Sequence, residues 1–198
     1  MELSKLFSGT YAGKTVFITG HTGFKGAWLT LWLQAMGARV VGYALEPPSE
    51  PSLWDVLQLD IDTHHRGDIR SPAILQEAMD EAKPDIVFNL AAQSLVRPSY
   101  EDPYGTFETN VMGTLNVLQA AGRCPSVRAL VNVTSDKCYE NQEWVYGYRE
   151  NDPMGGHDPY SASKGCAELL ASAWRRSFYA PEGKLLMATA RAGNVIGG

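Results

Sequence analysis

The sequence predicts an α/β fold with a Rossmann-like, doubly wound parallel sheet. Three observations point to it. Short β-branched runs alternate with amphipathic segments, glycines follow the first run, and 198 residues suit one domain of ordinary size. Parallel strands need right-handed crossover helices, so the alternation favours helices on both faces of the sheet. Ligands of such sheets bind beyond the carboxyl ends of the strands, so the residues just after 18, 88, 133 and 189 are expected to converge on one crevice at that edge.

Hydrophobic spacing predicts each element in turn. A first strand over 14–20 leads to a helix over 24–36, which Gly37 ends before a second buried strand over 38–45. Ser71 is the expected N-cap of the next helix, with proline at its first position. The later elements are a weak strand near 63–67, a helix over 72–82, a strand over 85–90, a long helix over 105–121, a strand over 129–134, a helix from 160 and a strand over 185–190.

Composition excludes several classes of function. The chain has 22 Asp and Glu against 17 Lys and Arg and no block of basic residues, which argues against nucleic acid or an anionic membrane as partner. No apolar run reaches the ~18 residues of a membrane span and the start lacks a signal-peptide core, so a cytoplasmic location is expected. The three cysteines form no CxxC pair and are expected as reduced thiols. His64, His65 and His157 lack metal-ligand spacing and are expected at ordinary polar positions.

A glycine-rich turn separates the first strand from the first helix. Its exposed N–H groups and the helix dipole could hold a pyrophosphate. The spacing is GxxGxxG, one residue longer than the GxGxxG dinucleotide pattern, so a tight turn without a ligand stays open as the alternative. The candidate cofactor residues of this turn are Gly20, His21, Thr22, Gly23, Phe24, Lys25 and Gly26.

The end of the second strand bears on the choice of cofactor. The stretch 42–44 carries no acidic residue for an adenosine ribose, and no Arg follows it to seat a 2′-phosphate. Lys25 and His21 could contribute positive charge, and the sequence favours NAD over NADP. Asp68, followed by Ile69, comes after the third strand and could accept from the adenine amino group. A carboxylate at the approach to a helix is the alternative.

Tyr160 and Lys164 lie one helical turn apart on one face of the predicted helix. Nearby positive charge lowers the pKa of a phenol, so Tyr160 could remove a hydroxyl proton while hydride leaves the same carbon. Ser135, at the end of the fifth strand, can hydrogen-bond the reacting oxygen. A solvated helix face is the alternative, and the position after the fifth strand weighs against it.

With these motifs, the chain resembles the extended short-chain dehydrogenases/reductases that act on nucleotide-sugars. The resemblance extends through nearly all of the chain, including 89–94, 109–114 and 191–195. It implies that Asn110 supports Tyr160 and Lys164. It also implies that one stretch lines the nicotinamide side of the site, namely Leu90, Ala91 and Ala92; core packing is the alternative for these three residues. The residues that would face the sugar nucleotide are Ser94, Ser135 and Asn194.

Asp136 and Lys137 favour a 4,6-dehydratase within that family. Oxidation of a hexose at C4 acidifies the C5 hydrogen, and loss of water then needs a base at C5 and an acid at the C6 hydroxyl. Asp136 could be the acid and Lys137 the base if both are desolvated. Most 4,6-dehydratases carry Asp-Glu here, so Lys137 points to the branch that acts on CDP-sugars and leaves the C5 base open. An exposed ion pair worth ~0–1 kcal/mol is the alternative.

The resemblance implies conversion of CDP-glucose to CDP-4-keto-6-deoxyglucose with NAD regenerated. A nucleotide-sugar epimerase, a GDP- or dTDP-sugar dehydratase, and a non-catalytic NAD-binding regulatory module stay open. The resemblance also implies a homodimer or a dimer of dimers, formed through the long helices near 105–121 and 160–178. Residues 1–198 are expected to be a dinucleotide-binding domain cut before a C-terminal sugar-nucleotide domain, and 139–158 a loop that closes over the sugar.

Overall fold

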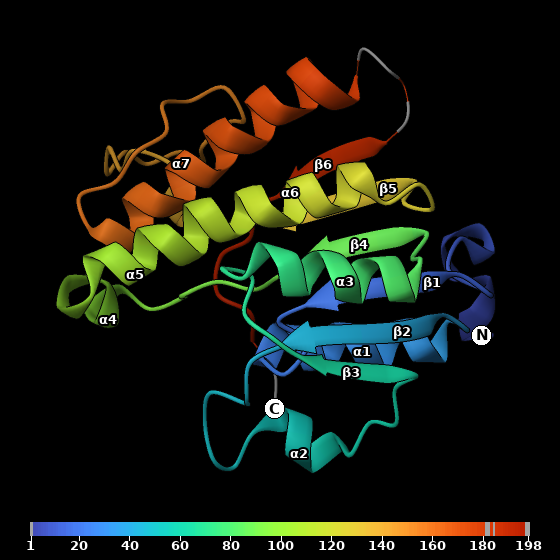
Figure 1. Cartoon of the computed structure of the whole chain (residues 1–198). Coiled ribbons are helices and arrows are strands. Elements are labelled where there is room, and N and C mark those ends of the chain that lie inside the picture. The colour runs from blue at the N-terminus through green and yellow to red at the C-terminus, as the bar shows by residue number, and fades with distance from the viewer. Residues whose placement is uncertain (1, 181–182, 184, 197–198) are drawn as a thin grey trace.

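One parallel sheet organises the molecule in the computed structural model, which describes residues 2–180, 183 and 185–196. Its strands lie in the order β3-β2-β1-β4-β5-β6 (Figure 1). The order reverses between β1 and β4, the switch point at which such sheets bind ligands. The predicted Rossmann-like parallel sheet is therefore confirmed. The strands are β1 Thr15–Thr19, β2 Arg39–Ala44, β3 Thr63–Arg66, β4 Ile86–Asn89, β5 Ala129–Val133 and β6 Leu186–Ala190.

Helices connect successive strands, as parallel pairing requires. Shorter helical turns are η1 Leu3–Gly9, η2 Glu108–Gly113, η3 Asp136–Cys138 and η4 Arg175–Tyr179, of which η2 and η4 are π-helical. In the part of the chain that the structure describes, no helix is both long and apolar enough to cross a bilayer. The α-helices are α1 Phe24–Ala35, α2 Leu53–Leu57, α3 Pro72–Ala82, α4 Val96–Glu101, α5 Pro103–Phe107, α6 Thr114–Arg123 and α7 Pro159–Trp174.

The helix expected over 105–121 is one continuous helical segment with a π-helical turn in its middle. Figure 1 shows α5, η2 and α6 following one another without a break. The π-helical segment η2 replaces regular α-helix there, a feature that often marks functional sites. The turns η1, α2 and α4 were not predicted, because five to seven residues are too few to display helical periodicity.

The N-cap expected at Ser71 is only partly right. Ser71 occupies the position before α3, and Pro72 begins the helix. Its backbone carbonyl accepts from the Leu75 N–H at 3.1 Å, but its side chain makes no cap hydrogen bond. The helix therefore starts where proline predicts, without help from the serine hydroxyl.

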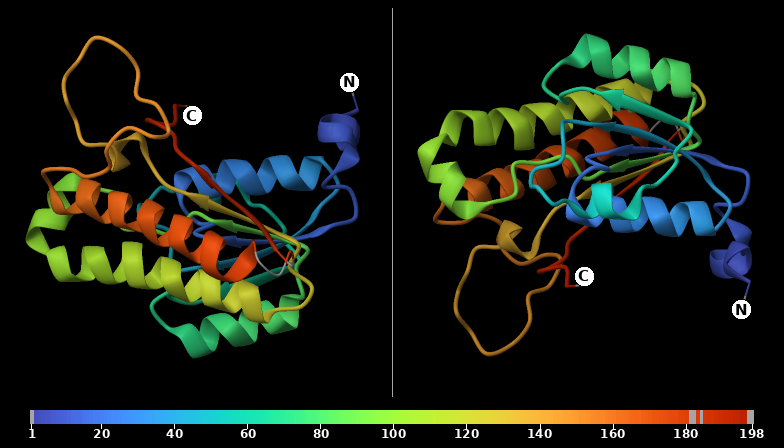
Figure 2. Two further views of the ribbon diagram at one scale, coloured as in Figure 1. Left: turned by 90° about the horizontal axis from the view of Figure 1, so that it is seen from above. Right: turned by 90° about the horizontal axis from the view of Figure 1, so that it is seen from below.

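The two faces of the sheet are covered unequally. Successive strand residues point to opposite faces, with α3, α6 and α7 on one side and α1 on the other (Figure 2). β1 and β2 are buried almost throughout, whereas exposure alternates along β5 and β6, where Leu186 is 75% exposed. The expectation of helices on both faces is thus right for the β1–β2 half and wrong for β5 and β6 within the described residues.

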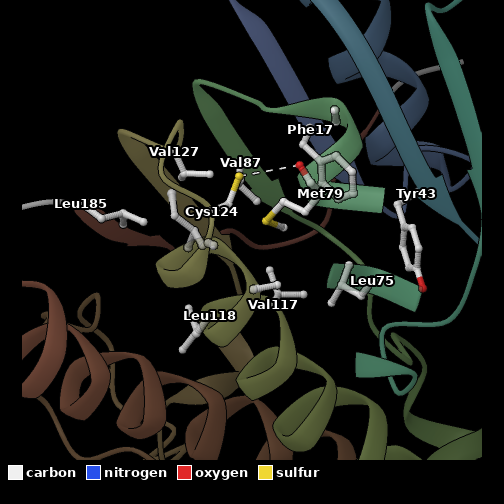
Figure 3. Close-up of a cluster of buried hydrophobic side chains, with 14 of the residues drawn as sticks. Phe17, Tyr43, Leu75, Met79, Val87, Val117, Leu118, Cys124, Val127 and Leu185 are labelled. Atoms are coloured by element: carbon white, nitrogen blue, oxygen red, sulfur yellow. Dashed lines mark hydrogen bonds between the residues drawn. The ribbon is translucent and has the colours of Figure 1, made fainter. Parts of the chain in front are cut away.

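The larger core cluster fills the space between the sheet and α3, α6 and α7 (Figure 3). Phe17 and Tyr43 extend from neighbouring strands toward Leu75 and Met79 of α3, and all four are 0% exposed. The Cys124 thiol donates to the Met79 carbonyl at 3.7 Å. All three cysteines are free thiols, as expected. Each such large apolar side chain contributes about 1.5–3 kcal/mol by its burial, which makes the sheet a rigid support for its carboxyl edge.

Candidate active site

A buried chain of polar side chains ties the carboxyl ends of three central strands together. The Thr19 hydroxyl donates to Asn89 Oδ1 at 2.5 Å, and Asn89 Nδ2 donates to Asn132 Oδ1 at 2.7 Å. All three side chains are at most 2% exposed. The Ala91 N–H donates to the Thr19 hydroxyl at 3.2 Å. The convergence expected of these strand ends is confirmed, although sequence reasoning did not identify the three side chains responsible.

The glycine turn packs directly against the end of β4. Gly20 has φ +76°, and a Cβ there would lie 2.8 Å from the Ala91 nitrogen. A Cβ on Gly26 would lie 2.1 Å from the Gly20 carbonyl oxygen. No side chain within the described ranges caps the start of α1, so its first N–H groups are left for an anion. This close turn fits a dinucleotide pyrophosphate.

His21 does not supply the positive charge expected of it. Its ring is 0% exposed, its Nε2 lies 2.8 Å from His64 Nδ1, and its centroid lies 4.8 Å from that of Trp54. Burial, with a smaller contribution from His64, lowers the pKa of His21 to about 3, so the ring is neutral at pH 7. A Cβ on Gly42 would lie 2.5 Å from this ring, which explains the glycine at this position in β2.

The other three histidines lie at exposed or half-buried polar positions, as expected. His64 is exposed and also hydrogen-bonds the buried His21. His157 fits the expectation, being a surface residue whose Nε2 lies 3.6 Å from Glu140. Other residues of the glycine turn differ in burial. Thr22 is buried and its hydroxyl donates to the Leu45 carbonyl at 3.0 Å, whereas Phe24 is exposed.

Asp68 already has a strong partner. Its carboxylate accepts from the Arg70 backbone N–H at 2.8 Å and from Arg70 Nε at 2.9 Å, and Arg70 Nη1 also reaches Glu108. Burial raises the pKa of Asp68, but the Arg70 hydrogen bonds outweigh it and the net direction is down. Ile69 is 3% exposed and packs in the larger core cluster. Contact of this pair with an adenine stays a prediction.

The stretch after β4 borders the same edge. Leu90, Ala91 and Ala92 are half-buried, and Leu90 and Ala91 pack against opposite core clusters. Core packing therefore accounts for part of their burial. Ser94 and Asn194 are exposed, and their contact with a sugar nucleotide stays a prediction.

Helix α7 carries Tyr160 and Lys164 into the site. Asp158 caps it, accepting from the Ser161 N–H at 2.8 Å, and Pro159 occupies its first turn. Tyr160 is 8% exposed and Lys164 is 7% exposed. Lys164 Nζ lies 5.9 Å from the centre of the Tyr160 ring. The predicted Tyr–Lys pair is confirmed as a neighbouring, buried pair.

The electrostatics of this pair correct one expectation. Burial raises the pKa of the Tyr160 phenol, and the nearby Ser135 side chain acts against it without reversing the direction. Burial also lowers the pKa of Lys164 to about 8. The expected lowering of the phenol pKa is therefore wrong in this structure, because desolvation favours the neutral form of both groups. Among the described residues, the Lys164 ammonium forms no ion pair, so it is available to a bound ligand.

Ser135 connects the tyrosine to the expected acid. Its hydroxyl donates to Asp136 Oδ1 at 3.0 Å and accepts from the Lys137 N–H at 3.2 Å. The Asp136 N–H donates to the Ala192 carbonyl at 3.1 Å, which holds η3 against the segment after β6. Asp136 and Lys137 are both exposed, so the desolvation expected for them is wrong: η3 lies at the open rim of the sheet. Their acid and base roles stay predictions.

Asn110 supports α7 through an intermediate residue. Its Nδ2 donates to Ser163 Oγ at 2.8 Å and to the Gln93 carbonyl at 2.9 Å, while its Oδ1 accepts from the Gln93 N–H. The side chain is 2% exposed and lies in the π-helical turn η2. The expected support is present, but it acts through Ser163, which lies between Tyr160 and Lys164 on α7.

The loop over 139–158 projects beyond the carboxyl edge (Figure 2). It carries its own packing: the rings of Tyr139 and Tyr148 stack at 5.1 Å and those of Trp144 and Tyr146 at 4.8 Å. Tyr139 also pairs with Met154 in a single antiparallel bridge. The loop thus has an internal structure at the rim of the site, and its closure over a sugar stays a prediction.

Comparison with known proteins agrees with this geometry. A family model described as GDP-mannose 4,6 dehydratase matches residues 17–185. The CDP-glucose 4,6-dehydratase of Salmonella typhimurium (strain LT2) is 57% identical over 193 residues, covering 95% of this chain and 54% of that protein. The GDP-mannose 4,6-dehydratase of Vibrio cholerae is 32% identical over 180 residues, covering 83% and 46%.

A solved structure gives the same fold. The UDP-glucose 4-epimerase of Thermus thermophilus in complex with NAD aligns with a TM-score of 0.77 and 29% identity, covering 92% of this chain and 56% of that one. The chain spans about half the length of the curated relatives it matches. By sequence and by fold, the chain belongs to the GDP-mannose 4,6-dehydratase family, the nucleotide-sugar dehydratases among the extended short-chain dehydrogenases/reductases.

Proposed function

We propose that this chain is the cofactor-binding and catalytic part of a 4,6-dehydratase that converts CDP-glucose to CDP-4-keto-6-deoxyglucose. The observation that carries the proposal is the meeting of Ser135 with Tyr160, whose neighbour on α7 is Lys164, beside Asp136 at the carboxyl edge. The relative named as a CDP-glucose enzyme is far more similar than the one named for GDP-mannose, which supports a CDP-sugar.

The cofactor of the proposal is NAD, held by the glycine turn and the uncapped start of α1. Gly20 and Gly26 leave no room for side chains, which fits a backbone that closely approaches a pyrophosphate. The buried Lys164 ammonium, without an ion-pair partner in the described ranges, fits a ribose hydroxyl. The NAD in the complex of the Thermus thermophilus epimerase supports the same choice. Bound there, NAD supplies the two-electron acceptor and donor that the sugar needs at C4 and C6.

The residues of α7 and η3 divide the proton transfers. Tyr160 takes the C4 hydroxyl proton, and Ser135 hydrogen-bonds the same oxygen. Because burial raises the pKa of Tyr160, a protonated Lys164 is needed to favour the phenolate. The resulting ketone acidifies C5–H. Once a bound sugar excludes water from the exposed Asp136 and Lys137, Lys137 accepts that proton while Asp136 donates one to the C6 oxygen, which leaves as water.

Subunit assembly and location complete the proposal. Exposed apolar side chains lie along the two helical segments expected to form a subunit contact, over 105–121 and 160–178, and support a homodimer or a dimer of dimers. They are Phe107, Met112, Leu169 and Phe178. The proposed location is the cytoplasm, where the free thiols would stay reduced.

Product analysis tests the function. Full-length protein is incubated with CDP-glucose and NAD, and the sugar is identified by NMR. We expect a 4-keto-6-deoxy sugar, with NAD needed only in catalytic amount. A C4-inverted sugar that keeps its C6 hydroxyl indicates an epimerase instead. Binding of NAD without any product favours the regulatory module, and product from GDP-mannose or dTDP-glucose alone overturns the choice of CDP.

A further inference from the structure

A buried carboxylate that the proposed chemistry does not use lies one helical turn beyond Lys164. Glu168 is 3% exposed and lies on the same face of α7 as Tyr160 and Lys164. A buried carboxylate is costly unless it is paired and hydrogen-bonded. The donors around Glu168 therefore show which parts of the fold it joins.

Three donors at the carboxyl ends of β5 and β6 meet this carboxylate. Thr134, directly after β5, donates its hydroxyl to Oε1. Thr189 of β6 donates to Oε2 at 3.0 Å, and Arg191 Nη2 donates to Oε2 at 2.9 Å. The Arg191 side chain is only 17% exposed, so this ion pair lies inside the protein. One side chain thus fixes α7 to the two strand ends that flank it.

The ion pair continues to the rim of the site. Arg191 Nη1 donates to the Tyr139 hydroxyl at 2.7 Å and to the Glu150 carbonyl at 3.3 Å. The guanidinium also lies 5.0 Å from the centre of the Tyr139 ring. The carboxylate is therefore linked to the loop over 139–158 as well as to the strand end that leads into Ser135.

We propose that Glu168 is a positioning residue of the reaction, which holds Tyr160 and Lys164 in register with Ser135 and with the loop over 139–158. The inference rests on the proposed function. Glu168 contacts neither substrate nor cofactor in this role; it acts through the helix and the strands that it joins.

The charge of Glu168 gives this role a signature that packing alone lacks. Burial lowers the pKa of Lys164, and Lys25 of α1 lowers it further, while Cys138 of η3 and Glu168 raise it. Removing the Glu168 charge therefore lowers the pKa of Lys164 below about 8. Protonated Lys164 is then lost at lower pH, and the alkaline limb of kcat/KM moves to lower pH.

The test compares two carboxylates that each join separate elements. Glu168→Gln keeps the shape and removes the charge. The control is Asp85→Asn: Asp85 accepts from the Thr15 N–H at 3.0 Å and from Lys14 Nζ at 3.2 Å at the opposite, amino ends of β1 and β4. In the full-length enzyme we expect Glu168→Gln to lower kcat by about 10- to 100-fold with KM changed by less than about 3-fold, the size of effect that slight misplacement produces. We expect Asp85→Asn to change neither kcat nor the pH profile.

A substrate-free measurement separates this proposal from the proposed function. A small amine-reactive reagent modifies Lys164 only in its neutral form. The modification rate, followed by mass spectrometry across pH, therefore reports the pKa of Lys164 directly. We expect a shift to lower pH in Glu168→Gln and none in Asp85→Asn. If wild-type protein makes no product but this shift is present, the proposed function fails while the link between Glu168 and Lys164 stands.

A second variant covers the case in which Glu168→Gln does not fold. Thr189→Val removes one donor to Glu168 and keeps the side-chain volume, and we expect it to lower kcat about 3-fold. If Glu168→Gln folds, an unchanged kcat, or a pH profile equal to that of Asp85→Asn, overturns the proposal. If it does not fold, an unchanged kcat in Thr189→Val overturns it.

Discussion

The two edges of the sheet use polar groups in opposite ways. At the amino edge, Asp85 pairs with Lys14, and their side chains are 33% and 49% exposed. At the carboxyl edge, Thr19, Asn89 and Lys164 are at most 7% exposed. Water screens the first set and is excluded from the second. The comparison shows that this fold concentrates costly buried polarity where the proposed chemistry takes place, so equal substitutions at the two edges should have unequal effects.

Tyr160→Phe should give the largest effect. It removes only the phenol oxygen, which accepts the substrate proton in its phenolate form, and we expect turnover to fall about 10²- to 10⁴-fold. NAD affinity and melting temperature should stay close to wild type. The matched control is Tyr179→Phe, which removes another buried hydroxyl, bonded to the Leu118 carbonyl in the core. Steady-state product formation measures both, and equal losses would remove Tyr160 from the mechanism.

Lys164→Met should stabilise the protein while it lowers turnover. The folded-state pKa of Lys164, about 8, lies below the ordinary 10.5, so the unfolded chain binds the proton more tightly. The free-energy cost of burying the protonated Lys164 is therefore full below pH 8, and it disappears as the pH rises toward 10.5, the pKa of lysine in the unfolded chain. Each pKa unit corresponds to about 1.4 kcal/mol, so we expect a gain on the order of 3 kcal/mol at pH 7 that vanishes near pH 10.5.

Urea unfolding at several pH values measures this change. The control is Lys5→Met, because the Lys5 side chain is 79% exposed and its substitution should stay within about 0.5 kcal/mol at every pH. A Lys164→Met variant that is less stable at pH 7 would contradict the buried, unpaired ammonium.

Gly26→Ala tests the close packing of the turn. The added methyl would lie 2.1 Å from the Gly20 carbonyl oxygen, so the backbone must shift. We expect about 1–3 kcal/mol of lost stability and weaker NAD binding, measured by thermal unfolding and calorimetry. At Gly147 a Cβ has nothing within 4 Å, so Gly147→Ala should change neither quantity. Undiminished NAD affinity in Gly26→Ala would argue against a pyrophosphate on this turn.

Lys14→Met should give the smallest effect. It breaks an exposed pair at the amino edge, which is worth about 0–1 kcal/mol and is weakened by salt. Asp85 keeps its bond to the Thr15 N–H. We expect a change below about 1 kcal/mol in urea unfolding and unchanged turnover. A loss as large as that of Gly26→Ala would erase the difference between the two edges.

Local patterns account for what the sequence could predict. The β-branched runs, the glycines at 20, 23 and 26, and the spacing of Tyr160 and Lys164 are all readable over a few residues. They were enough for the class of sheet and for the Tyr–Lys pair. The position of Glu168, four residues after Lys164, was a readable signal of the same kind, because it predicts one helix face.

Long-range contacts account for what the sequence could not predict. The burial of His21 depends on Trp54 and His64, which lie 33 and 43 positions further along the chain. The direction of the Tyr160 pKa depends on burial outweighing the effect of the nearby Ser135 side chain, a balance set by the whole fold. The exposure of Asp136 depends on where η3 lies relative to the segment after β6.

The fate of one hydrogen atom tests the proposed dehydration most directly. CDP-glucose deuterated at C4 is incubated with full-length protein and NAD, and the product is analysed by NMR and mass spectrometry. The account predicts a 4-keto-6-deoxy sugar that carries the deuterium on its C6 methyl group. Deuterium found again at C4 of a sugar that keeps its C6 hydroxyl would contradict it.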